Sequence, residues 1–182
     1  PTATWDTSYV REWLNHDFYE NAFSDEEKQQ IILSYLDNAS DASKYIDAGN
    51  NTEDYIFLPD RDDIIQYYHI NAEMGENQFY SEQAICEPTA SAAALCESSY
   101  TLTQQMYDAV YRNYGYRADI VGTNGCEWWI RNPGLYTPMN ALRVGANGNV
   151  YDLGNNVSYY AFVRPAMWIS LEDGDIPGND TP

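Results

Sequence analysis

The stretch WWIRNPG, residues 128–134, places two tryptophans, an isoleucine and an arginine directly before a Pro-Gly turn. Its β-branched and aromatic residues, within CEWWIR (126–131), predict a strand. Side chains on a strand alternate between two faces, so Trp128 and Ile130 point one way and Trp129 and Arg131 the other. We therefore expect one of the two tryptophans to be deeply buried.

A related block, FVRPAMWISL, follows at residues 162–171. The other tryptophan of the first block could stack on Arg131 or Arg164 through a cation–π contact. An arginine at the edge of an aromatic core can also satisfy loop carbonyls and acids. Pro165 favours a bulge or an edge position for the strand predicted over 159–164. The expected structural platform consists of Trp128, Trp129, Arg131, Arg164 and Trp168.

Between these blocks, ALRVGANGNVYDLG (141–154) carries the best local signal in the chain. Asn147-Gly148 lies between two alternating runs, which predicts a hairpin with a two-residue turn. In that register Ala146 opposes Asn149, Val144 opposes Tyr151, and Arg143 forms a cross-strand ion pair with Asp152.

The N-terminal half predicts short helices. Thr7 or Ser8 can cap a helix in TSYVREWLNHDF (7–18), and Ser24 with Glu27 forms a capping box for a helix from Asp25. Asp60 can cap a third helix over 60–68. We expect YIFLP (55–59) to be a strand, 37–54 a loop and 102–115 a further helix. Helices that precede antiparallel strands indicate an α+β domain with long irregular loops.

The 182 residues suit one domain, and 44% of them are hydrophobic. Acidic residues outnumber basic ones by 28 to 9, giving a formal charge of −19. The sequence shows no basic footprint for nucleic acid and no apolar run of membrane-spanning length, so we expect neither partner. The tail 172–182 has the acidic, Pro/Gly-punctuated composition of a linker.

Three cysteines allow at most one internal disulfide, and Cys86 with Cys96 could close a short loop. Their spacing fits no zinc pattern, and Gly-rich phosphate loops and hydrolase signatures are missing. The acidic run DRDD (60–63) lacks the glycine and spacing of a calcium loop, so we expect it to cap a helix. The sequence therefore predicts no catalytic residues, no metal ligands and no cofactor, and calcium stays possible but unsupported.

Residues 136–160 carry only two formal charges and are rich in Asn, Tyr and Gly. These residue types are common in antibody-type contact loops and in sugar recognition, although Asn and Gly also serve ordinary turns. The predicted ligand contacts are Tyr136, Asn140, Arg143, Asn147, Asn149, Tyr151, Asn155, Asn156, Tyr159 and Tyr160.

A longer pattern carries a resemblance. W-D-T-S-x-x-R-x-W-L-N-x-x-F-Y-x-x-A-F-S-x-x-E runs from Trp5 to Glu27 and is followed in order by YIFLP, WWIRNPG and FVRPAMWI. Together they resemble an uncharacterised bacterial domain family whose members end in a WWLRSPG…VRPALW pattern. That family looks like a branch of the C-type-lectin-like fold, near the formylglycine-generating enzymes. The resemblance implies a C-type-lectin-like domain over residues 1–171, with short helices packed on small antiparallel sheets.

The sequence departs from this resemblance in three ways. Strands that normally precede the W-D-T block are not seen before Trp5. The catalytic relatives use a cysteine pair, whereas only Cys126 lies in the C-terminal third. The calcium-dependent sugar motifs EPN, QPD and WND are absent. Neither that catalysis nor that sugar-binding mode is carried over.

Three functions follow as hypotheses. The first is a non-catalytic recognition domain of a bacterial surface or secreted protein, binding a glycan or a protein through residues 136–160. Related folds serve as variable proteins of diversity-generating retroelements, and the composition of this segment suits such diversification. The second is an oxidoreductase of the formylglycine-generating type that uses Cys126. The third is a structural module that self-associates through exposed strand edges.

Overall fold

The computed structural model describes residues 3–39, 46–68, 79–80, 82–92, 126–135, 137–146, 148–159 and 161–171. The protein is α+β, with short helices and three small sheets, as the sequence predicts. The helix predicted over 102–115 and the residues Cys96, Tyr136, Asn147 and Tyr160 lie outside the described residues.

The N-terminal helical region has three consecutive parts: α1 (Tyr9–Trp13), a π-helical turn (Leu14–Phe18) and α2 (Tyr19–Ala22). The Ser8 side chain accepts a hydrogen bond from the backbone N–H of Arg11, so Ser8 is the N-cap. This confirms one of the two predicted capping residues.

Two further helices begin with complete capping boxes. Ser24 caps α3 (Asp25–Gln30), and Asp60 caps α4 (Arg61–Tyr67). In each, the cap side chain accepts from the backbone N–H three residues later, whose own carboxylate accepts from the cap N–H. Both helices therefore start where the sequence predicts.

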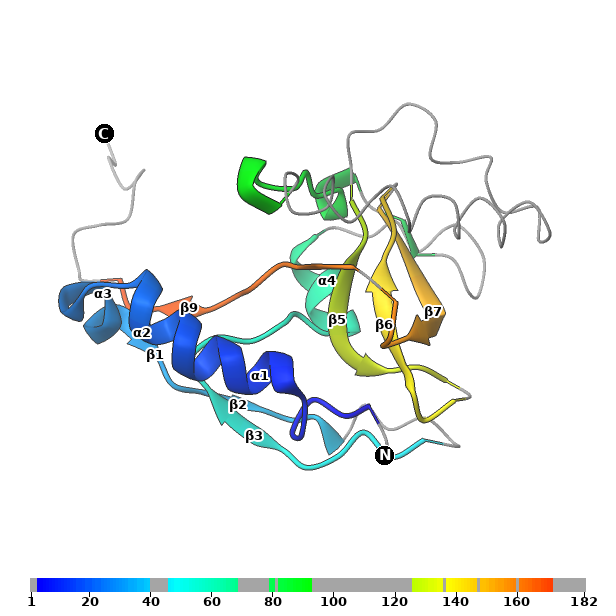
Figure 1. Ribbon diagram of the computed structural model, residues 1–182, viewed down its shortest axis with the longest axis horizontal. Coiled ribbons are helices and arrows are strands. Elements are labelled where there is room, and N and C mark those ends of the chain that lie inside the picture. Colours follow the sequence, from blue (N-terminus) through cyan, green and yellow to red (C-terminus); the bar gives the residue numbers. More distant parts are fainter. Residues whose placement is uncertain are drawn as a thin grey trace, which may run out of the picture.

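Two of the sheets are antiparallel pairs of short strands. β1 (Ile31–Ile32) pairs with β9 (Trp168–Ile169), and β2 (Ser34–Leu36) pairs with β3 (Thr52–Asp54). Figure 1 shows both pairs in the half of the molecule that contains α1, α2 and α3. Because β3 lies within residues 37–54, the expectation that this whole segment is a loop is wrong.

The third sheet has five strands in the order β4-β7-β6-β5-β8. Its strands are β4 (Phe79–Tyr80), β5 (Trp128–Pro133), β6 (Asn140–Val144), β7 (Asn149–Asn156) and β8 (Phe162–Val163). β5 confirms the predicted strand, and β8 is an edge strand that ends before Pro165. The expected C-terminal block is not wholly antiparallel, because β8 runs parallel to β5. At the start of this parallel pair, the Phe162 N–H donates a hydrogen bond to Glu127 O at 2.8 Å.

The predicted hairpin is present, but its register differs by one residue. Val144 pairs with Val150, and Arg143 pairs with Tyr151 rather than with Asp152. The turn is longer than two residues, because the Gly145 N–H donates to Asn149 O at 2.7 Å and the Gly148 N–H donates to Gly145 O at 2.9 Å. Gly148 has a φ of 82°, which is typical of the glycine that ends a three-residue hairpin loop.

The strand predicted over 55–59 is reduced to one isolated bridge, between Phe57 and Ala166. The other backbone N–H and C=O groups of this segment form hydrogen bonds outside any sheet. The Asn15 Oδ1 atom accepts from the N–H groups of Tyr55 and Ile56, at 2.8 and 3.1 Å. Pro59 O accepts from the backbone N–H of Arg131 at 3.1 Å. The segment is buried and extended, but side chains replace the neighbouring strand.

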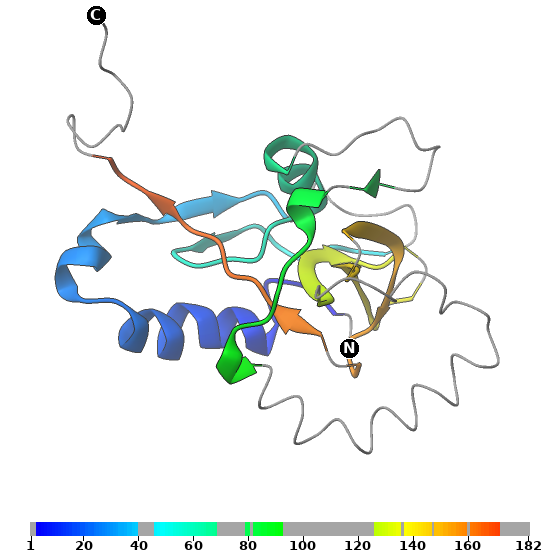
Figure 2. The same cartoon turned by 90° about the horizontal axis from the view of Figure 1, so that it is seen from above.

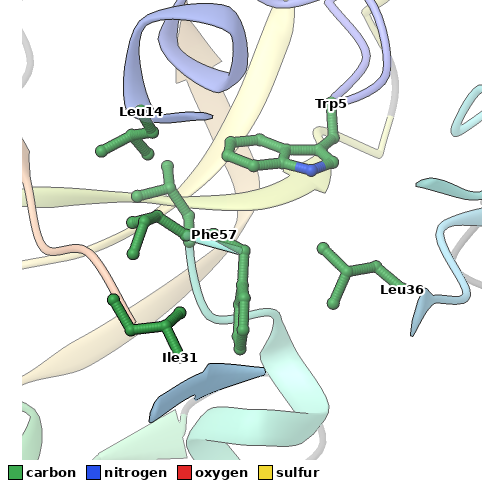
Figure 3. Close-up of a cluster of buried hydrophobic side chains, with 7 residues drawn as sticks. Trp5, Leu14, Ile31, Leu36 and Phe57 are labelled. Carbon is green, nitrogen blue, oxygen red and sulfur yellow. The ribbon is translucent and has the colours of Figure 1, made fainter. Parts of the chain in front are cut away.

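Two hydrophobic cores lie on the two faces of the five-stranded sheet. Trp128 and Ile130 point into a cluster with α4, while Trp129 packs against a second cluster, as strand alternation predicts. Figure 3 shows five side chains of that second cluster: Trp5, Leu14, Ile31, Leu36 and Phe57. The sheet is therefore held between the two cores.

Candidate functional site

The described part of the segment 136–160 forms β6, β7 and their flanking loops. Tyr159 is exposed, whereas the four described asparagines of the predicted contacts are half-buried: Asn140, Asn149, Asn155 and Asn156. Three other predicted contacts lie outside the described residues, and the side chain of Tyr151 does too. Whether these residues contact a ligand stays a prediction.

Arg143 differs from the rest of the predicted contacts. Its side chain is buried and forms an ion pair with Glu127, the residue before β5. A buried guanidinium that is paired with a half-buried carboxylate serves the fold, because exposing it would break the pair with Glu127. The structure therefore places Arg143 below the surface, where it joins β6 to the start of β5.

Four large apolar side chains are exposed near the end of the hairpin that is remote from Gly148. They are between 45% and 60% exposed, and we call them the hairpin-end surface: Met139, Leu153, Val157 and Tyr159. The Val157 N–H donates to Met139 O at 2.9 Å, so Met139 and Val157 are cross-strand neighbours. The Tyr159 N–H donates to Asn156 O at 2.9 Å, which folds Tyr159 back toward the strand end. Sequence reasoning missed the three aliphatic members because it selected Asn and Tyr by composition.

Two glycines allow the backbone at this end to pack closely. A Cβ atom on Gly154 would lie 2.5 Å from Ala141 O, and Gly154 has a φ of 67°. A Cβ atom on Gly134 would lie 2.5 Å from the Asn140 Cβ atom. Only glycine fits such contacts without a shift of the neighbouring strand. These positions hold β6, β7 and the Pro-Gly turn in one rigid unit.

Trp128 is the deeply buried tryptophan, and it is also the one that meets an arginine. The Arg164 guanidinium lies 5.0 Å from the Trp128 ring centroid and 4.8 Å from that of Tyr68. The Trp128 Nε1–H donates to Ala84 O at 3.0 Å. The expectation that the other tryptophan stacks on an arginine is therefore wrong, because Trp129 packs in the opposite core.

The Arg131 guanidinium satisfies acids and a loop carbonyl, as expected. Its side chain is only 6% exposed, and it forms ion pairs with Asp60 and with Asp63, the latter at 2.9 Å. It also donates to Leu58 O at 3.1 Å and to Asn38 Oδ1 at 3.2 Å. Burial raises the pKa of the Asp60 carboxyl, and the Arg131 charge opposes that rise. Arg131 thereby ties β5 to the start of α4.

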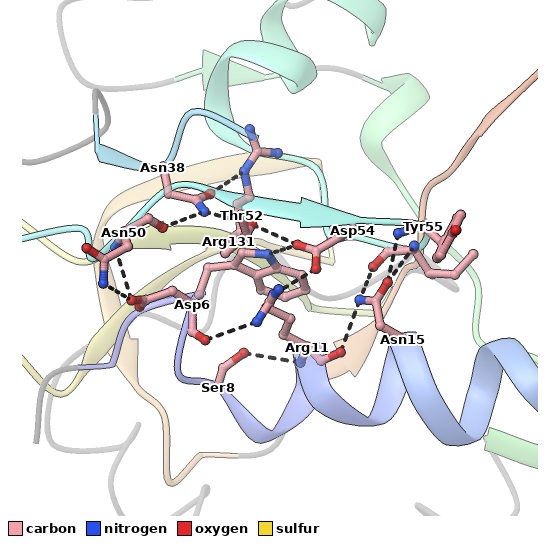
Figure 4. Close-up of polar contacts among 12 residues, drawn as sticks. Asp6, Ser8, Arg11, Asn15, Asn38, Asn50, Thr52, Asp54, Tyr55 and Arg131 are labelled. Carbon is pink, nitrogen blue, oxygen red and sulfur yellow. Dashed lines mark hydrogen bonds and ion pairs between the residues drawn. The ribbon is translucent and has the colours of Figure 1, made fainter. Parts of the chain in front are cut away.

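A polar network continues from Asn38 to the N-terminal helix (Figure 4). The Asn38 amide donates to Thr52 Oγ1 at 3.1 Å, and Thr52 donates to Asp54 Oδ2 at 2.8 Å. The buried Asp54 carboxylate also accepts from Trp5 Nε1 at 2.8 Å and pairs with Arg11 at 2.7 Å. Burying a carboxylate costs free energy unless donors such as these satisfy its oxygen atoms. Trp5 and Arg11, two positions of the W-D-T-S-x-x-R pattern, therefore serve the fold.

Asp6 fastens the same region to the loop before β3. Its Oδ2 atom accepts from the backbone and the side chain of Asn50, at 3.0 and 2.8 Å. Burial acts to raise the pKa of Asp6, but hydrogen bonds from Thr4, Asn50 and Thr7 outweigh it, so the pKa lies below its ordinary value. A Cβ atom on Gly49 would lie 2.3 Å from Asp6 Oδ1, which explains the glycine there.

A polar hollow of about 280 Å³ lies beside α1. Its lining residues are Asp6, Thr7, Ser8, Arg11, Glu12, Asn15 and His16. Most of these groups are already engaged, because Ser8 caps the helix and Arg11 holds Asp54. The Asn15 side chain donates to Ile56 O at 2.8 Å and accepts from the backbone N–H of Tyr55 at 2.8 Å. The lining therefore mainly joins α1 to β3.

Trp168 does not join the other members of the predicted platform. It lies in β9, is exposed, and meets Tyr67 edge-on with ring centroids 5.4 Å apart. Figures 1 and 2 both show β9 at the opposite end of the molecule from β6 and β7. Of the other four platform residues, Arg164 meets Trp128 on one face of β5, whereas Trp129 and Arg131 lie on the other face.

Cys86 carries a free thiol, and Cys126 is buried. The structure therefore does not show the loop closure by Cys86 and Cys96 that the sequence allows. Among the described residues, no group of three or more His, Cys, Asp or Glu side chains is arranged to hold a metal ion. None of the described helices has the length and apolar character needed to cross a membrane.

Comparison with known families gives one match. A family model described as a domain of unknown function (DUF6273) matches residues 1–171. No curated protein sequence and no solved structure matches the chain.

Proposed function

Since the chain belongs to the DUF6273 family, a domain family of unknown function, we propose its role from its own surface. The proposed role is non-catalytic ligand recognition, in a bacterial surface or secreted protein. The ligand would bind at the hairpin-end surface. The observation that carries this proposal is the exposure of Met139, Leu153, Val157 and Tyr159 at one end of a rigid hairpin.

The charge of this segment supports the proposal. The chain has a formal charge of −19, yet residues 136–160 contain only Arg143 and Asp152 as charged residues. Arg143 is buried and paired. Depletion of charge around exposed apolar and tyrosine side chains is the composition found at the centre of protein interfaces. Exposed apolar side chains at such a site are more favourably solvated by the apolar surface of a partner than by water.

The chemistry of the surface favours a protein as the ligand. Three of its four side chains are aliphatic, which suits burial against apolar side chains of a partner. A glycan would need flat aromatic faces beside free amide pairs. Tyr159 offers such a face and the neighbouring asparagines are half-buried, so a glycan remains the alternative ligand.

The C-type-lectin-like relationship belongs to this proposal. It rests on the order of the W-D-T-S, YIFLP, WWIRNPG and FVRPAMWI motifs along the chain. An experimental structure of a longer stretch of the same protein, compared with lectin-like domains, would test it. The proposed recognition role does not depend on that relationship.

The test begins with a screen for ligands. The labelled chain is applied to a glycan array with and without calcium, and to an array of proteins from surfaces that bacteria encounter. For any ligand found, Tyr159→Ala and Leu153→Ala should each weaken binding about tenfold, which corresponds to losing one contact of about 1.4 kcal/mol. Their melting temperatures should stay near that of the unsubstituted chain.

Tyr35→Ala is the matched control. Tyr35 is 66% exposed on β2, in a different sheet, and its loss should leave binding unchanged. Ligand binding that survives both hairpin-end substitutions would place the recognition site elsewhere. Unfolding by those substitutions would show that the side chains serve the core instead.

A further inference from the structure

A second apolar surface lies at the end of the molecule that contains β1 and β9. Four large side chains there are between 45% and 48% exposed, and we call them the β1–β9 surface: Ile32, Leu33, Tyr67 and Trp168. Monomeric proteins seldom leave so many large apolar side chains together in water. Trp and Tyr are also the residue types most enriched among binding hot spots.

Three of these side chains are in contact or directly paired: Ile32, Trp168 and Tyr67. Ile32 and Trp168 are directly paired across the two strands, so their side chains share one face. The Trp168 ring meets the Tyr67 ring of α4 at a centroid distance of 5.4 Å and an angle of 68°. The pairing continues past β9, since the Ser170 N–H donates to Gln30 O at 2.7 Å. The surface therefore runs from α4 across β1 and β9.

The two faces of this strand pair differ. Ile31 faces inward and is buried in the core with Trp5 and Leu14, whereas its neighbour Ile32 faces outward. A two-stranded sheet gains little stability in water from its own hydrogen bonds. An exposed apolar outer face on such a pair is therefore best satisfied by a partner that covers it.

The surrounding charge selects the kind of partner. Asp25, Glu26 and Glu27 are exposed in the first turn of α3, which leads directly into β1. Lys28 does not neutralise them, because its ammonium group pairs with Glu20 at 2.6 Å. A second copy of the chain would bring a further formal charge of −19 to the same contact. Repulsion therefore disfavours self-association, and a partner with basic groups around an apolar centre is favoured.

We propose that the β1–β9 surface docks a second protein, which inserts aliphatic or aromatic side chains between Ile32, Trp168 and Tyr67. Lysine and arginine residues of that protein would face the acidic first turn of α3. The strands β1 and β9 lie at the opposite end of the molecule from β6 and β7 in both views (Figures 1 and 2). The inference does not rest on the proposed recognition function.

The test uses two synthetic peptides of about nine residues, the length of a long strand. Both alternate a charged residue with leucine or phenylalanine, and they differ only in having lysine or glutamate at the charged positions. Binding to the chain is followed by calorimetry at low and at physiological salt. The lysine peptide should bind, the glutamate peptide should bind at least tenfold more weakly, and salt should reduce the difference.

Variants then locate the binding. Trp168→Ala and Ile32→Thr should each weaken the lysine peptide about tenfold, and the threonine keeps the β-branched shape that suits a strand. Leu153→Ala is the matched control, because it removes an equally exposed aliphatic side chain from the hairpin-end surface. It should leave the lysine peptide unaffected.

Four results would overturn the inference. Equal binding of both peptides would show a merely hydrophobic surface. Binding that neither variant weakens, or no binding at all, would remove this surface as a docking site. Light scattering that detects a dimer which Ile32→Thr dissociates would assign the surface to a second copy instead. Loss of ligand binding in Leu153→Ala bears only on the proposed function, so the two proposals fail separately.

Discussion

At the scale of single residues, Arg131 does the most to connect distant parts of the chain. Its guanidinium reaches Asn38 beyond β2, Leu58 before α4, and the two aspartates that begin α4. Its backbone N–H donates to Pro59 O. Five hydrogen bonds and ion pairs thus involve the side chain and the backbone N–H of Arg131. They hold β5 against α4 and the segment before it.

Arg131→Ala should lower the free energy of unfolding by about 3 to 5 kcal/mol. Removing one partner of a buried ion pair leaves the other charge buried without compensation, and here both Asp60 and Asp63 lose their partner. Urea unfolding followed by tryptophan fluorescence measures the change. Lys28→Ala is the control, because that lysine pairs with an exposed glutamate and its loss should scarcely alter stability. Equal effects of the two substitutions would contradict the role given to Arg131.

The role of Arg131 could be predicted from sequence, but its partners could not. Successive side chains of a strand point to opposite faces, so Trp128 and Ile130 lie on one face and Trp129 and Arg131 on the other. That rule needs only the order of residues in the sequence. Which acids Arg131 meets depends on how α4 packs against β5, and no local pattern reports that. The same limit applies to Arg143, whose charge suggested a surface contact although Glu127 holds it inside.

At the scale of elements, helix starts were predictable and strand pairings were not. Capping depends on residues three apart, so Ser24 and Asp60 revealed their helices. The hairpin was visible in Asn147-Gly148, but its register depends on whether Gly148 ends a two-residue or a longer loop. The short β1 and β9 carry no such signal, since their residues lie far apart in the sequence.

Gly154→Ala should destabilise the hairpin more than Gly148→Ala. Both glycines have positive φ, at 67° and 82°, and an alanine at such a φ costs about 1 to 2 kcal/mol. At Gly154 the new Cβ atom would also lie 2.5 Å from Ala141 O, so β6 must shift. Thermal unfolding of the two variants measures the difference. A larger loss in Gly148→Ala would show that the turn, rather than the close contact of β6 and β7, limits the hairpin.

At the scale of the whole molecule, the dominant property is charge. The formal charge of −19 is spread over a chain in which several of the described cations pair with particular acids: Arg11 with Asp54, Lys28 with Glu20, and Arg131 with two aspartates. Self-repulsion of the remaining carboxylates favours expanded states over the compact one. Repulsion among carboxylates therefore lowers the free energy of unfolding, and the other interactions of the fold must offset it.

Salt should raise the melting temperature at neutral pH. Raising the ionic strength from about 0.01 M to about 0.1 M shortens the screening length from about 30 Å to about 10 Å, which weakens repulsion among exposed carboxylates. The increase should shrink near pH 4, where carboxylates begin to take up protons. Calorimetry at two salt concentrations and two pH values measures both effects. A melting temperature that falls with salt at neutral pH would mean that the ion pairs outweigh the repulsion.

The pairing of β1 with β9 has a consequence for how the protein is made. Ile31 can pair only after Ile169 has been synthesised. The edge of the sheet beside Trp128 is likewise completed only by Phe162. A ribosome releases residues in order, and it still holds the last part of the chain while the first helices emerge. Neither core can close until the C-terminal residues have left the exit tunnel. Nascent chains of this domain therefore present unfinished apolar surfaces throughout their synthesis, and they complete both cores in one late step.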